Sequence, residues 1–491
     1  MVISLFSCTK IKNIMENILN ALNVANDILW TYVVITLLVF CALYFTIRTK
    51  GVQFRMPKEM WRILTGTDIP KAKKNGTKRI GSFQAFAVSL SSRVGTGNLA
   101  GVASAIFIGG PGAVFWMWAM ALLGAATAFV ESTLAQLYKK KGADSFYGGP
   151  AYYMQTGLKK KWMGVVFAIL ITITFGMANQ IVQSNTLCDS LSDTFGIEKI
   201  IIGSVLTIFT LIIIFGGIQR ISRFASIVVP FMAIGYILLA LIVLIMNITS
   251  IPNLIDLILS NAFGAEQAAG GIVGAAVMQG IKRGLFSNEA GEGSAPNAAA
   301  IAETSHPVKQ GLLQAMGVFT DTLIICTCTA FIILISGKHD CGADGIILTT
   351  LALEHEIGPV GRYFITSAIF LFAYSTIIAN YFYGETNIRF ITRRKWAVNI
   401  FRIFTGVTVM AGALMSLQTA WSIVDIFMGL MTIFNLIAIF LLFDRVNRLL
   451  KNYIEQKKAG KEPVFNRNML PDLKDEIECW EEDVKKEELR G

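Results

Sequence analysis

Residues 91–101 read SSRVGTGNLAG, and residues 283–297 read RGLFSNEAGEGSAPN. Each stretch lies inside an apolar segment, and each contains a Gly-x-Gly core, at positions 95–97 and 291–293. Glycine weakens a helix, and backbone without helical hydrogen bonds is tolerated at membrane depth only where it is buried in protein or lines a cavity. The two stretches therefore predict a pair of helices that are interrupted midway across a membrane.

The composition is that of a membrane protein. Of the 491 residues, 54% are hydrophobic and 15% are charged, whereas about 25% of residues are charged in soluble domains. Lys and Arg outnumber Asp and Glu by 43 to 33, but they cluster between apolar segments, where they set orientation and do not indicate a nucleic-acid partner. The seven Cys and three His show no CxxC or His-x-His spacing, so neither a transition-metal site nor a disulfide framework is predicted.

A membrane-spanning helix needs about 20 apolar residues, and ten clear runs of this kind are present. They lie near residues 28–46, 84–108, 113–137, 163–187, 199–217, 224–247, 310–336, 360–384, 396–417 and 421–443. A further stretch, Glu266–Ala302, is long enough to cross but contains Lys282, Arg283, Glu289 and Glu292. We count it as a broken span, which gives an all-α polytopic membrane protein with eleven transmembrane helices.

Basic residues gather in alternate loops between these spans. The basic loops occupy residues 48–79, 139–161, 220–223, 389–395 and the tail from residue 445. By the positive-inside rule these loops are cytoplasmic, so we expect a multi-pass protein of the cell membrane with its C-terminus in the cytoplasm and its N-terminus outside. The alternation holds only if the broken stretch is counted as a crossing.

Without the leading helix, the two interrupted segments open the two halves of a ten-helix array. The predicted organisation is an N-terminal tail (1–27), an extra transmembrane helix with a cytoplasmic loop (28–80), two five-helix repeats (81–247 and 248–444) and a C-terminal tail (445–491). An odd number of helices per repeat inverts the second repeat relative to the first. The polar stretches 56–78 and 445–491 are expected to be solvated cytoplasmic arms, and no nucleophile–base set or soluble domain indicates an enzyme.

Interrupted segments in corresponding places of two inverted halves mark the binding site of a transporter. Their freed N–H groups and helix N-termini can hold a carboxylate, and their freed carbonyls can hold a cation. The alternative is that the glycines only allow close packing of helices. Glu131, Glu289, Glu292 and Arg93 are costly at membrane depth, so we expect them to pair with one another or to line water.

Four motifs carry a resemblance to a known family. They are RVGTGN at 93–98, GGPG at 109–112, GPAYYM at 149–154 and RGLFSNEAG at 283–291. In their order and spacing they resemble the alanine/glycine:cation symporter family over roughly residues 30 to 445. The resemblance implies a LeuT-like fold with five plus five inverted helices, preceded here by one extra N-terminal helix.

The resemblance also implies which residues form the site. The implied substrate-binding residues are Gly95, Thr96, Gly97, Asn98, Gln183, Asn185, Phe286, Ser287, Asn288 and Glu289. The implied sodium-binding residues are Ser91, Val94, Asn98, Ser287, Ser375 and Thr376. In this pattern Asn98 lies near both the carboxylate and a sodium ion. The hydroxyls of Ser375 and Thr376 complete a second sodium position beside the carbonyls near Ser91 and Val94.

The predicted function is import of a small neutral amino acid, alanine or glycine, coupled to sodium by alternating access. Each positive charge moved inward through about 100 mV gains about 2.3 kcal/mol, so sodium can drive accumulation of a zwitterion. No cofactor is expected apart from the coupling ion, and the partners are the amino acid, sodium and the lipid bilayer. A proton-coupled carrier or an exchanger of another amino acid, such as serine or glutamine, stays open, and an ion channel is a remote alternative.

Overall fold

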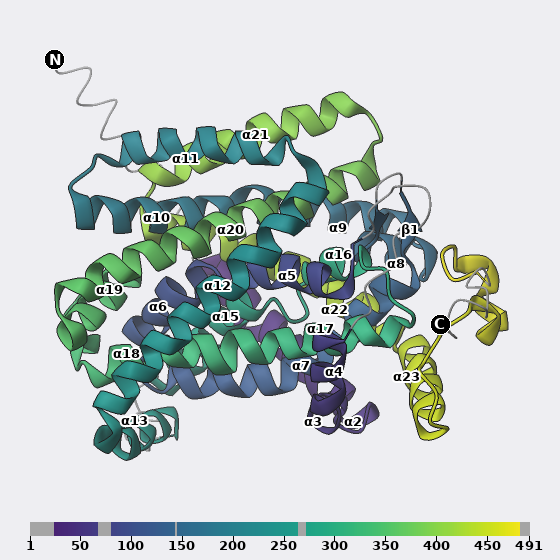
Figure 1. Cartoon of the computed structure of the whole chain (residues 1–491), viewed down its shortest axis with the longest axis horizontal. Helices are drawn as coiled ribbons and strands as arrows, with labels where there is room; N and C mark the ends of the chain where they lie inside the picture. The colour runs from purple at the N-terminus through teal and green to yellow at the C-terminus, as the bar shows by residue number, and fades with distance from the viewer. Residues whose placement is uncertain (1–23, 67–79, 143–144, 264–271, 482–491) are drawn as a thin grey trace.

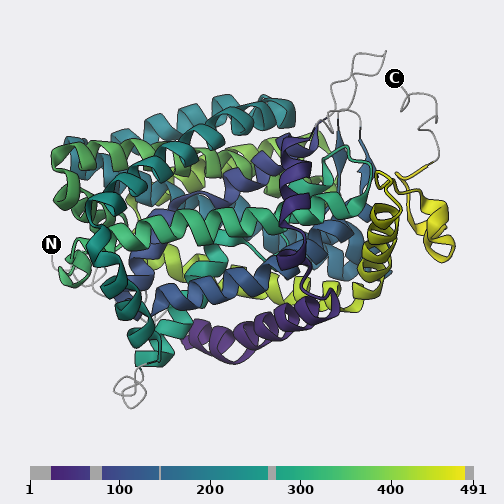
Figure 2. The same cartoon turned by 60° about the horizontal axis from the view of Figure 1, so that its bottom comes forward.

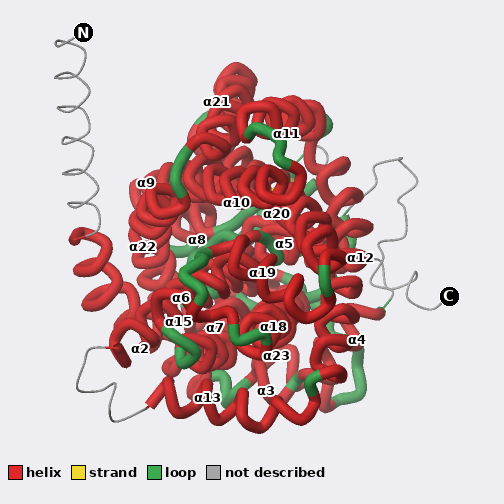
Figure 3. Tube along the Cα trace, turned by 90° about the vertical axis from the view of Figure 1, so that its left-hand side faces the viewer, coloured by secondary structure: helices red, strands yellow, loops and turns green. Residues whose placement is uncertain are grey.

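A computed structural model describes residues 24–66, 80–142, 145–263 and 272–481. These residues are almost entirely helical (Figure 3). The described strands, β1 (Lys140–Lys141) and β2 (Phe146–Tyr147), form one short antiparallel hairpin. The long helices lie roughly along one axis of the molecule, with α5 and α15 near the centre of the bundle (Figure 1).

The helices are grouped by the predicted leading segment and the two predicted halves, with η marking π-helical or 3-10 turns. The leading segment comprises η1 (Leu29–Val34), α2 (Ile35–Arg48), α3 (Val52–Arg55) and α4 (Pro57–Thr65). The first half comprises α5 (Ser82–Arg93), η2 (Gly97–Gly101), α6 (Val102–Gly109), α7 (Ala113–Leu137), α8 (Pro150–Thr156), α9 (Lys161–Ile173), η3 (Thr174–Ala178), α10 (Asn179–Phe195), α11 (Lys199–Ile214) and α12 (Gly217–Met246).

The second half follows two connecting elements. The connection comprises η4 (Ile248–Ser250) and α13 (Ile251–Phe263). The second half comprises α15 (Ile272–Asn288), α16 (Ala295–Ala300), α17 (Pro307–Val318), η5 (Phe319–Cys326), α18 (Thr327–Ile335), η6 (Lys338–Asp340), α19 (Gly345–Ile357), α20 (Pro359–Ile391), α21 (Lys395–Leu414) and α22 (Leu417–Leu441). The tail comprises α23 (Phe443–Lys458), η7 (Arg467–Met469) and η8 (Pro471–Glu476).

Eight helices of the described residues are long and apolar enough to cross a membrane. They are Val24–Arg48, Ala113–Leu137, Lys161–Phe195, Gly217–Met246, Pro307–Ile335, Pro359–Ile391, Lys395–Leu414 and Leu417–Leu441. The other three predicted spans correspond to the shorter helix α11 and to the two interrupted segments, α5–α6 and α15–α16. The interruptions are confirmed, and the count of eleven crossings stays a prediction.

Glycine and proline set the boundaries of several helices. Gly110 has a positive φ of 71° directly after α6, which is a conformation that suits a residue without Cβ. Pro307 occupies the first turn of α17, where its missing N–H leaves no hydrogen bond unmade. The side chain of His306 accepts a hydrogen bond from the N–H of Val308 at 3.2 Å and so caps the same helix.

The core is formed by helices from both halves. α7 packs against α15, α16 and α17, while α10 packs against α20 and α21. The leading helix α2 lies along the lower edge of the bundle in Figure 2 and contacts α7 and α22. The preceding turn η1 is fixed to α22, because the indole N–H of Trp30 donates to the carbonyl of Asp425 at 3.0 Å.

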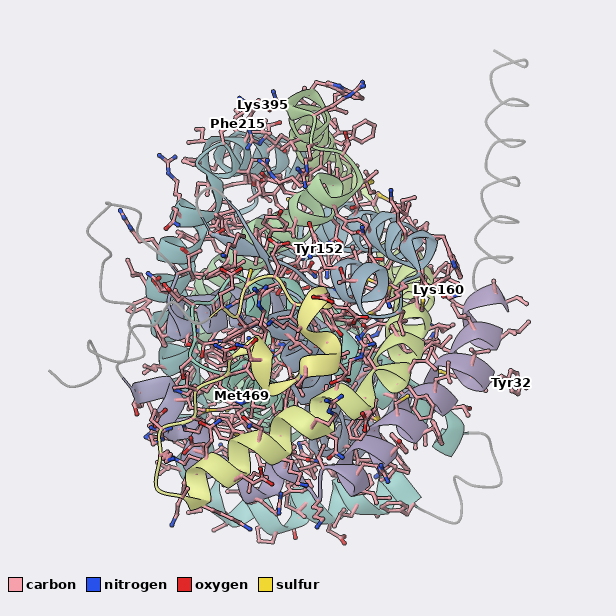
Figure 4. The ribbon with its side chains drawn as sticks, turned by 90° about the vertical axis from the view of Figure 1, so that its right-hand side faces the viewer. Tyr32, Tyr152, Lys160, Phe215, Lys395 and Met469 are labelled. Carbon is pink, nitrogen blue, oxygen red and sulfur yellow. The ribbon has the colours of Figure 1, made fainter. Side chains whose placement is uncertain are left out.

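The polar tail is packed against the bundle, so the expectation of a solvated arm was wrong for its described part. Helix α23 lies across one end of the molecule, with the rest of the tail folded beside it (Figure 4). The buried residues of α23 are Phe443, Val446, Leu449, Leu450 and Tyr453. Beyond the helix, the N–H of Phe465 donates to the carbonyl of Ser305 at 2.9 Å, and the indole N–H of Trp480 donates to that of Gln136 at 3.0 Å.

The other polar arm, which contains α4, meets this tail through ion pairs. Glu59 lies 2.7 Å from Arg62 and 3.1 Å from Lys457. Burial raises the pKa of Glu59, but the hydrogen bond from Arg62 acts against it. Further hydrogen bonds from Tyr453 and Lys457 leave this pKa at about 2, so Glu59 is ionised at neutral pH. The charges that suggested two solvated arms therefore hold the arms to each other.

We predict that Trp480→Ala loosens the tail. Removing a buried tryptophan typically costs about 3–5 kcal/mol, and Trp480 is only 6% exposed. We expect faster cleavage of the tail by trypsin in detergent-solubilised protein. Met469→Ala, at a position that is 46% exposed in the same segment, is the matched control and should be cleaved at the wild-type rate. Equal cleavage of the wild type and the Trp480 variant would contradict the packed position of the tail.

Candidate functional site

The first interruption lies between α5 and η2. Val94 has φ −79° and ψ 85°, which ends the helix. The N–H of Gly95 donates to Oδ1 of Asn98 at 2.9 Å. The N–H of Thr96 donates to Oε1 of Gln183, on α10, at 3.1 Å. The donors freed by the break are thus paired with side-chain oxygens, as buried backbone requires.

The second interruption lies between α15 and α16. Glu289, Gly291 and Gly293 have positive φ values of 57°, 97° and 83°, and this conformation is uncommon for a residue other than glycine. The N–H of Gly291 donates to Oε1 of Glu131, on α7, at 3.3 Å. Its carbonyl accepts a hydrogen bond from Asn435, on α22, at 2.8 Å. Side chains from two other helices therefore satisfy the unwound backbone.

The two interruptions lie against each other. A Cβ atom added at Gly97 would lie 3.0 Å from Cδ1 of Phe286 and 3.2 Å from Cα of Ser287. The hydroxyl of Ser92 donates to the carboxyl group of Glu289. Glycine at position 97 is what permits this close approach of the two backbones.

A buried carboxyl group joins the two broken helices to a third one. Asp321 lies in η5, within the span that begins with α17. Its Oδ1 accepts a hydrogen bond from Asn98 at 2.6 Å, and its Oδ2 accepts one from Ser287 at 2.7 Å. The Thr322 hydroxyl lies 3.0 Å from the same Oδ2. Carboxylate and hydroxyl oxygens converge here beside the amide group of Asn98, and oxygen is the ligand that hard cations prefer.

A second group of oxygens lies where α5 meets α20. The hydroxyl of Thr376 lies 2.9 Å from the carbonyl oxygen of Ser91 and 3.4 Å from that of Val94. The carbonyl of Ser375 accepts a hydrogen bond from the Ser91 hydroxyl at 2.9 Å. The Ser375 hydroxyl itself donates to the carbonyl of Phe372 at 3.0 Å. Thr376 thus contributes its hydroxyl to this group of oxygens, as the resemblance implied. Ser375 contributes its backbone carbonyl and not the hydroxyl that the resemblance implied.

The remaining expected residues differ in position. Gln183 contacts the first break, as described above, and Asn288 ends α15 with its Oδ1 accepting from the N–H of Ala290 at 3.0 Å. Asn185 donates instead to the carbonyl of Met415, beyond α21, at 2.6 Å. The structure therefore does not bring Asn185 together with the other expected residues. Asn185 follows Gln183 by two residues, which on a helix is a rotation of roughly 200°. The two side chains therefore leave α10 on nearly opposite sides.

Sequence reasoning missed two residues of this region. Asp321 lies inside the predicted span 310–336, and an isolated acid in an apolar span is itself a signal that could have identified it. Trp421, on α22, packs edge-on against Phe286 with ring centroids 4.7 Å apart. Arg283 stacks over Trp421 at 3.9 Å and forms two hydrogen bonds with Asp425, at 3.1 Å and 2.9 Å. No pattern in the sequence placed the aromatic residue there.

The fold resembles that of a solved structure. The structure of MhsT in complex with L-phenylalanine matches with a TM-score of 0.54 and 13% sequence identity, covering 81% of this chain and 92% of that one. At this identity the likeness establishes the fold alone. The LeuT-like fold predicted from the sequence is therefore confirmed.

Curated relatives match over nearly the full length. The probable sodium/glutamine symporter GlnT of Bacillus subtilis is 50% identical over 96% of this chain and 97% of its own length. The amino-acid carrier protein AlsT of the same species is also 50% identical, over 96% of this chain and 99% of its own. A sodium/proton-dependent alanine carrier protein of Bacillus sp. is 39% identical over 85% of this chain and 98% of its own.

The family model described as the sodium:alanine symporter family matches residues 15–467. That range includes both interruptions and the residues of η5 and α20 that surround them. The chain belongs to the sodium:alanine symporter family.

Proposed function

We propose that this protein imports a small neutral amino acid, alanine or glycine, together with sodium. The observation that carries the proposal is the meeting of the two interrupted helices in the interior of the bundle, where Gly97, just after the first break, lies against Ser287, just before the second. Unwound backbone at this depth supplies polar groups that a zwitterion needs when it leaves water. Alternating access would be a relative movement of helix groups around this site.

The carboxylate of the substrate is assigned to the first break. The N–H groups of Gly95 and Thr96 are the donors available there, and their present acceptors are side-chain oxygens of Asn98 and Gln183. A carboxylate could replace such oxygens without leaving a donor unpaired. Substrate binding would then move Gln183, while Asn98 stays beside both the substrate and an ion.

Sodium is assigned to the two oxygen groups. One is formed by Asp321 with Asn98 and Ser287, and the other by Thr376 with the carbonyl oxygens of Ser91 and Val94. Ser91 and Asn98 lie on α5 and η2, and Val94 lies in the break between them, next to the proposed carboxylate position. Because the ions and the substrate share that backbone, each favours binding of the other, and this coupling is what symport requires.

The aromatic pair Phe286–Trp421 supports a small substrate. Phe286 lies against the position of Gly97, and Trp421 lies 3.8 Å from a Cβ added at Gly101. Two large rings beside the break leave little room for a long side chain. Glutamine is nevertheless the second candidate, because a relative with 50% identity is described as a probable sodium/glutamine symporter.

Uptake by proteoliposomes that contain the purified protein tests the proposal. We expect labelled alanine or glycine to accumulate when a sodium gradient is applied and not when a lithium or proton gradient replaces it. A panel that includes serine and glutamine decides the substrate. Accumulation driven by protons alone would replace sodium symport with proton symport, and labelled sodium flux without amino acid would indicate a channel.

We predict that Thr376→Val weakens sodium binding. A hydrogen-bond or ion contact to a charged group contributes about 1.5–3 kcal/mol, so the sodium concentration for half-maximal uptake should rise about 10- to 150-fold. Thr376→Ser should restore most of the affinity. Thr366→Val, which removes another buried hydroxyl of α20 that contacts Thr194 at 2.7 Å, is the control for helix packing. Wild-type sodium dependence in the Thr376→Val variant would refute the ion position.

We predict that Gly97→Ala weakens substrate binding whereas Gly101→Ala does not. A methyl group at position 97 would press on the Phe286 ring and the Ser287 backbone, whereas at position 101 its nearest neighbour lies at 3.8 Å. Overpacking typically costs about 1–3 kcal/mol, which corresponds to a loss of about 5- to 150-fold in affinity. Substrate binding measured by calorimetry, with expression and thermal stability as controls, checks the difference. Equal affinities in the two variants would be incompatible with a site at position 97.

A further inference from the structure

Glu292 has a position that the proposed function does not use. It lies in the unwound segment between α15 and α16, five residues beyond Ser287, and it is fully buried. Neither of its carboxyl oxygens has a hydrogen-bond partner among the described residues. Buried carboxylates are normally paired or hydrogen-bonded, because burial strongly disfavours a charge without a partner.

The charged groups that act on Glu292 come from its own segment and from three other helices. The groups that act on it electrostatically are Glu289 of the same segment, Glu131 on α7, Arg93 on α5 and Asp425 on α22. Tyr153 interacts electrostatically with Glu131, and Tyr383 with Glu289 and Arg93. The acids among these groups therefore outnumber the single arginine that faces them.

The other acids are occupied by neighbours. Glu131 accepts hydrogen bonds from Gly291 at 3.3 Å and from Asn435 at 2.7 Å. Glu289 accepts hydrogen bonds from Ser92 and from Ser294. The carboxylate of Asp425 belongs to its own ion pair with Arg283. Glu292 is thus the acid in this group for which the described residues supply no donor.

The cation of this group is also incompletely bound. The Nη1 atom of Arg93 donates to the carbonyl of Gln314 at 3.1 Å. Its Nε and Nη2 atoms have no hydrogen-bond partner among the described residues. We expected Arg93 and the three glutamates to pair with one another or to line water, and the hydrogen bond that Arg93 forms is to the backbone carbonyl of Gln314. If Glu131, Glu289 and Glu292 were all ionised, two negative charges would stay uncompensated beside this one arginine.

A proton can neutralise Glu292 without further ligands, whereas a metal ion cannot. A metal ion needs several ligands around one point, and the described residues contain no group of three His, Cys, Asp or Glu side chains arranged to hold one. A proton needs only the carboxyl group itself. We propose that Glu292 is a proton-binding site, protonated while the two interrupted helices are packed together, through which transport responds to pH.

This proposal rests on the proposed transport function and adds a residue for proton sensitivity to it. When water reaches the segment, the O–H bond of the Glu292 carboxyl breaks and the proton passes to water. The carboxylate that is left then repels Glu289 and Glu131, which bind Ser92 of the first broken helix and Gly291 of the second. Loss of the proton therefore weakens contacts between the two halves, and its return closes them.

Glu292→Gln provides the test, because glutamine has the shape of the protonated acid and cannot ionise. In proteoliposomes held at saturating sodium, we expect wild-type uptake to fall by up to about tenfold per pH unit once the proton is lost, the limit for a single titrating group. Uptake by the Glu292→Gln variant should vary less than about twofold over the same range. Glu455→Gln, the same change at an exposed position on α23, should keep the wild-type pH profile.

Infrared spectroscopy of the purified protein gives a readout that does not depend on transport. We expect a carbonyl stretching band of a protonated carboxyl group in the wild type and in Glu455→Gln, and its loss in Glu292→Gln. Either a pH profile unchanged by Glu292→Gln, or a band that persists in that variant, overturns the proposal. A band that appears only when sodium is removed would also overturn it, since a cation would then occupy the site. Failure of all amino-acid uptake with the band intact would overturn the transport function and leave the proton site standing.

Discussion

Every polar backbone group inside a bilayer must find a partner within the protein, and this constraint governs the centre of the molecule. Two helices lose their regular hydrogen bonds there, and the freed groups are satisfied by Asn98, Gln183, Glu131 and Asn435, which lie on other helices or further along the chain. The interruptions are therefore stable only inside a complete bundle. The same requirement explains why so many amides and acids lie in a chain that is otherwise apolar.

The fold could be predicted from the sequence because its signals are local. Runs of apolar residues identify spans, and Gly-x-Gly cores identify the two breaks, since glycine acts on its own segment of backbone. Contacts between side chains on different helices could not be predicted in this way. Asn185 is polar and lies two residues from Gln183, but its direction is set by the packing of α10 against α21, which no local pattern contains.

Acids were the hardest class to interpret from sequence. Glu131 and Asp321 look alike as single charges in apolar spans, yet one supports unwound backbone and the other joins three segments through Asn98 and Ser287. Their roles depend on which donors the fold brings to them. In the tail, mixed acids and lysines suggested solvation, whereas Glu59 and Lys457 pair across the two polar arms. Charge composition alone does not distinguish a solvated arm from one held by ion pairs.

The position of α23 across the end of the bundle has a consequence for biosynthesis. Arg62 and Glu462 are hydrogen-bonded although 400 residues separate them in the chain, and the tail also touches segments that follow α7 and α16. Such contacts cannot form until the ribosome has released the last helix, whereas each membrane span can insert as it emerges. The final tertiary contacts of the polypeptide therefore form only after the tail has been synthesised.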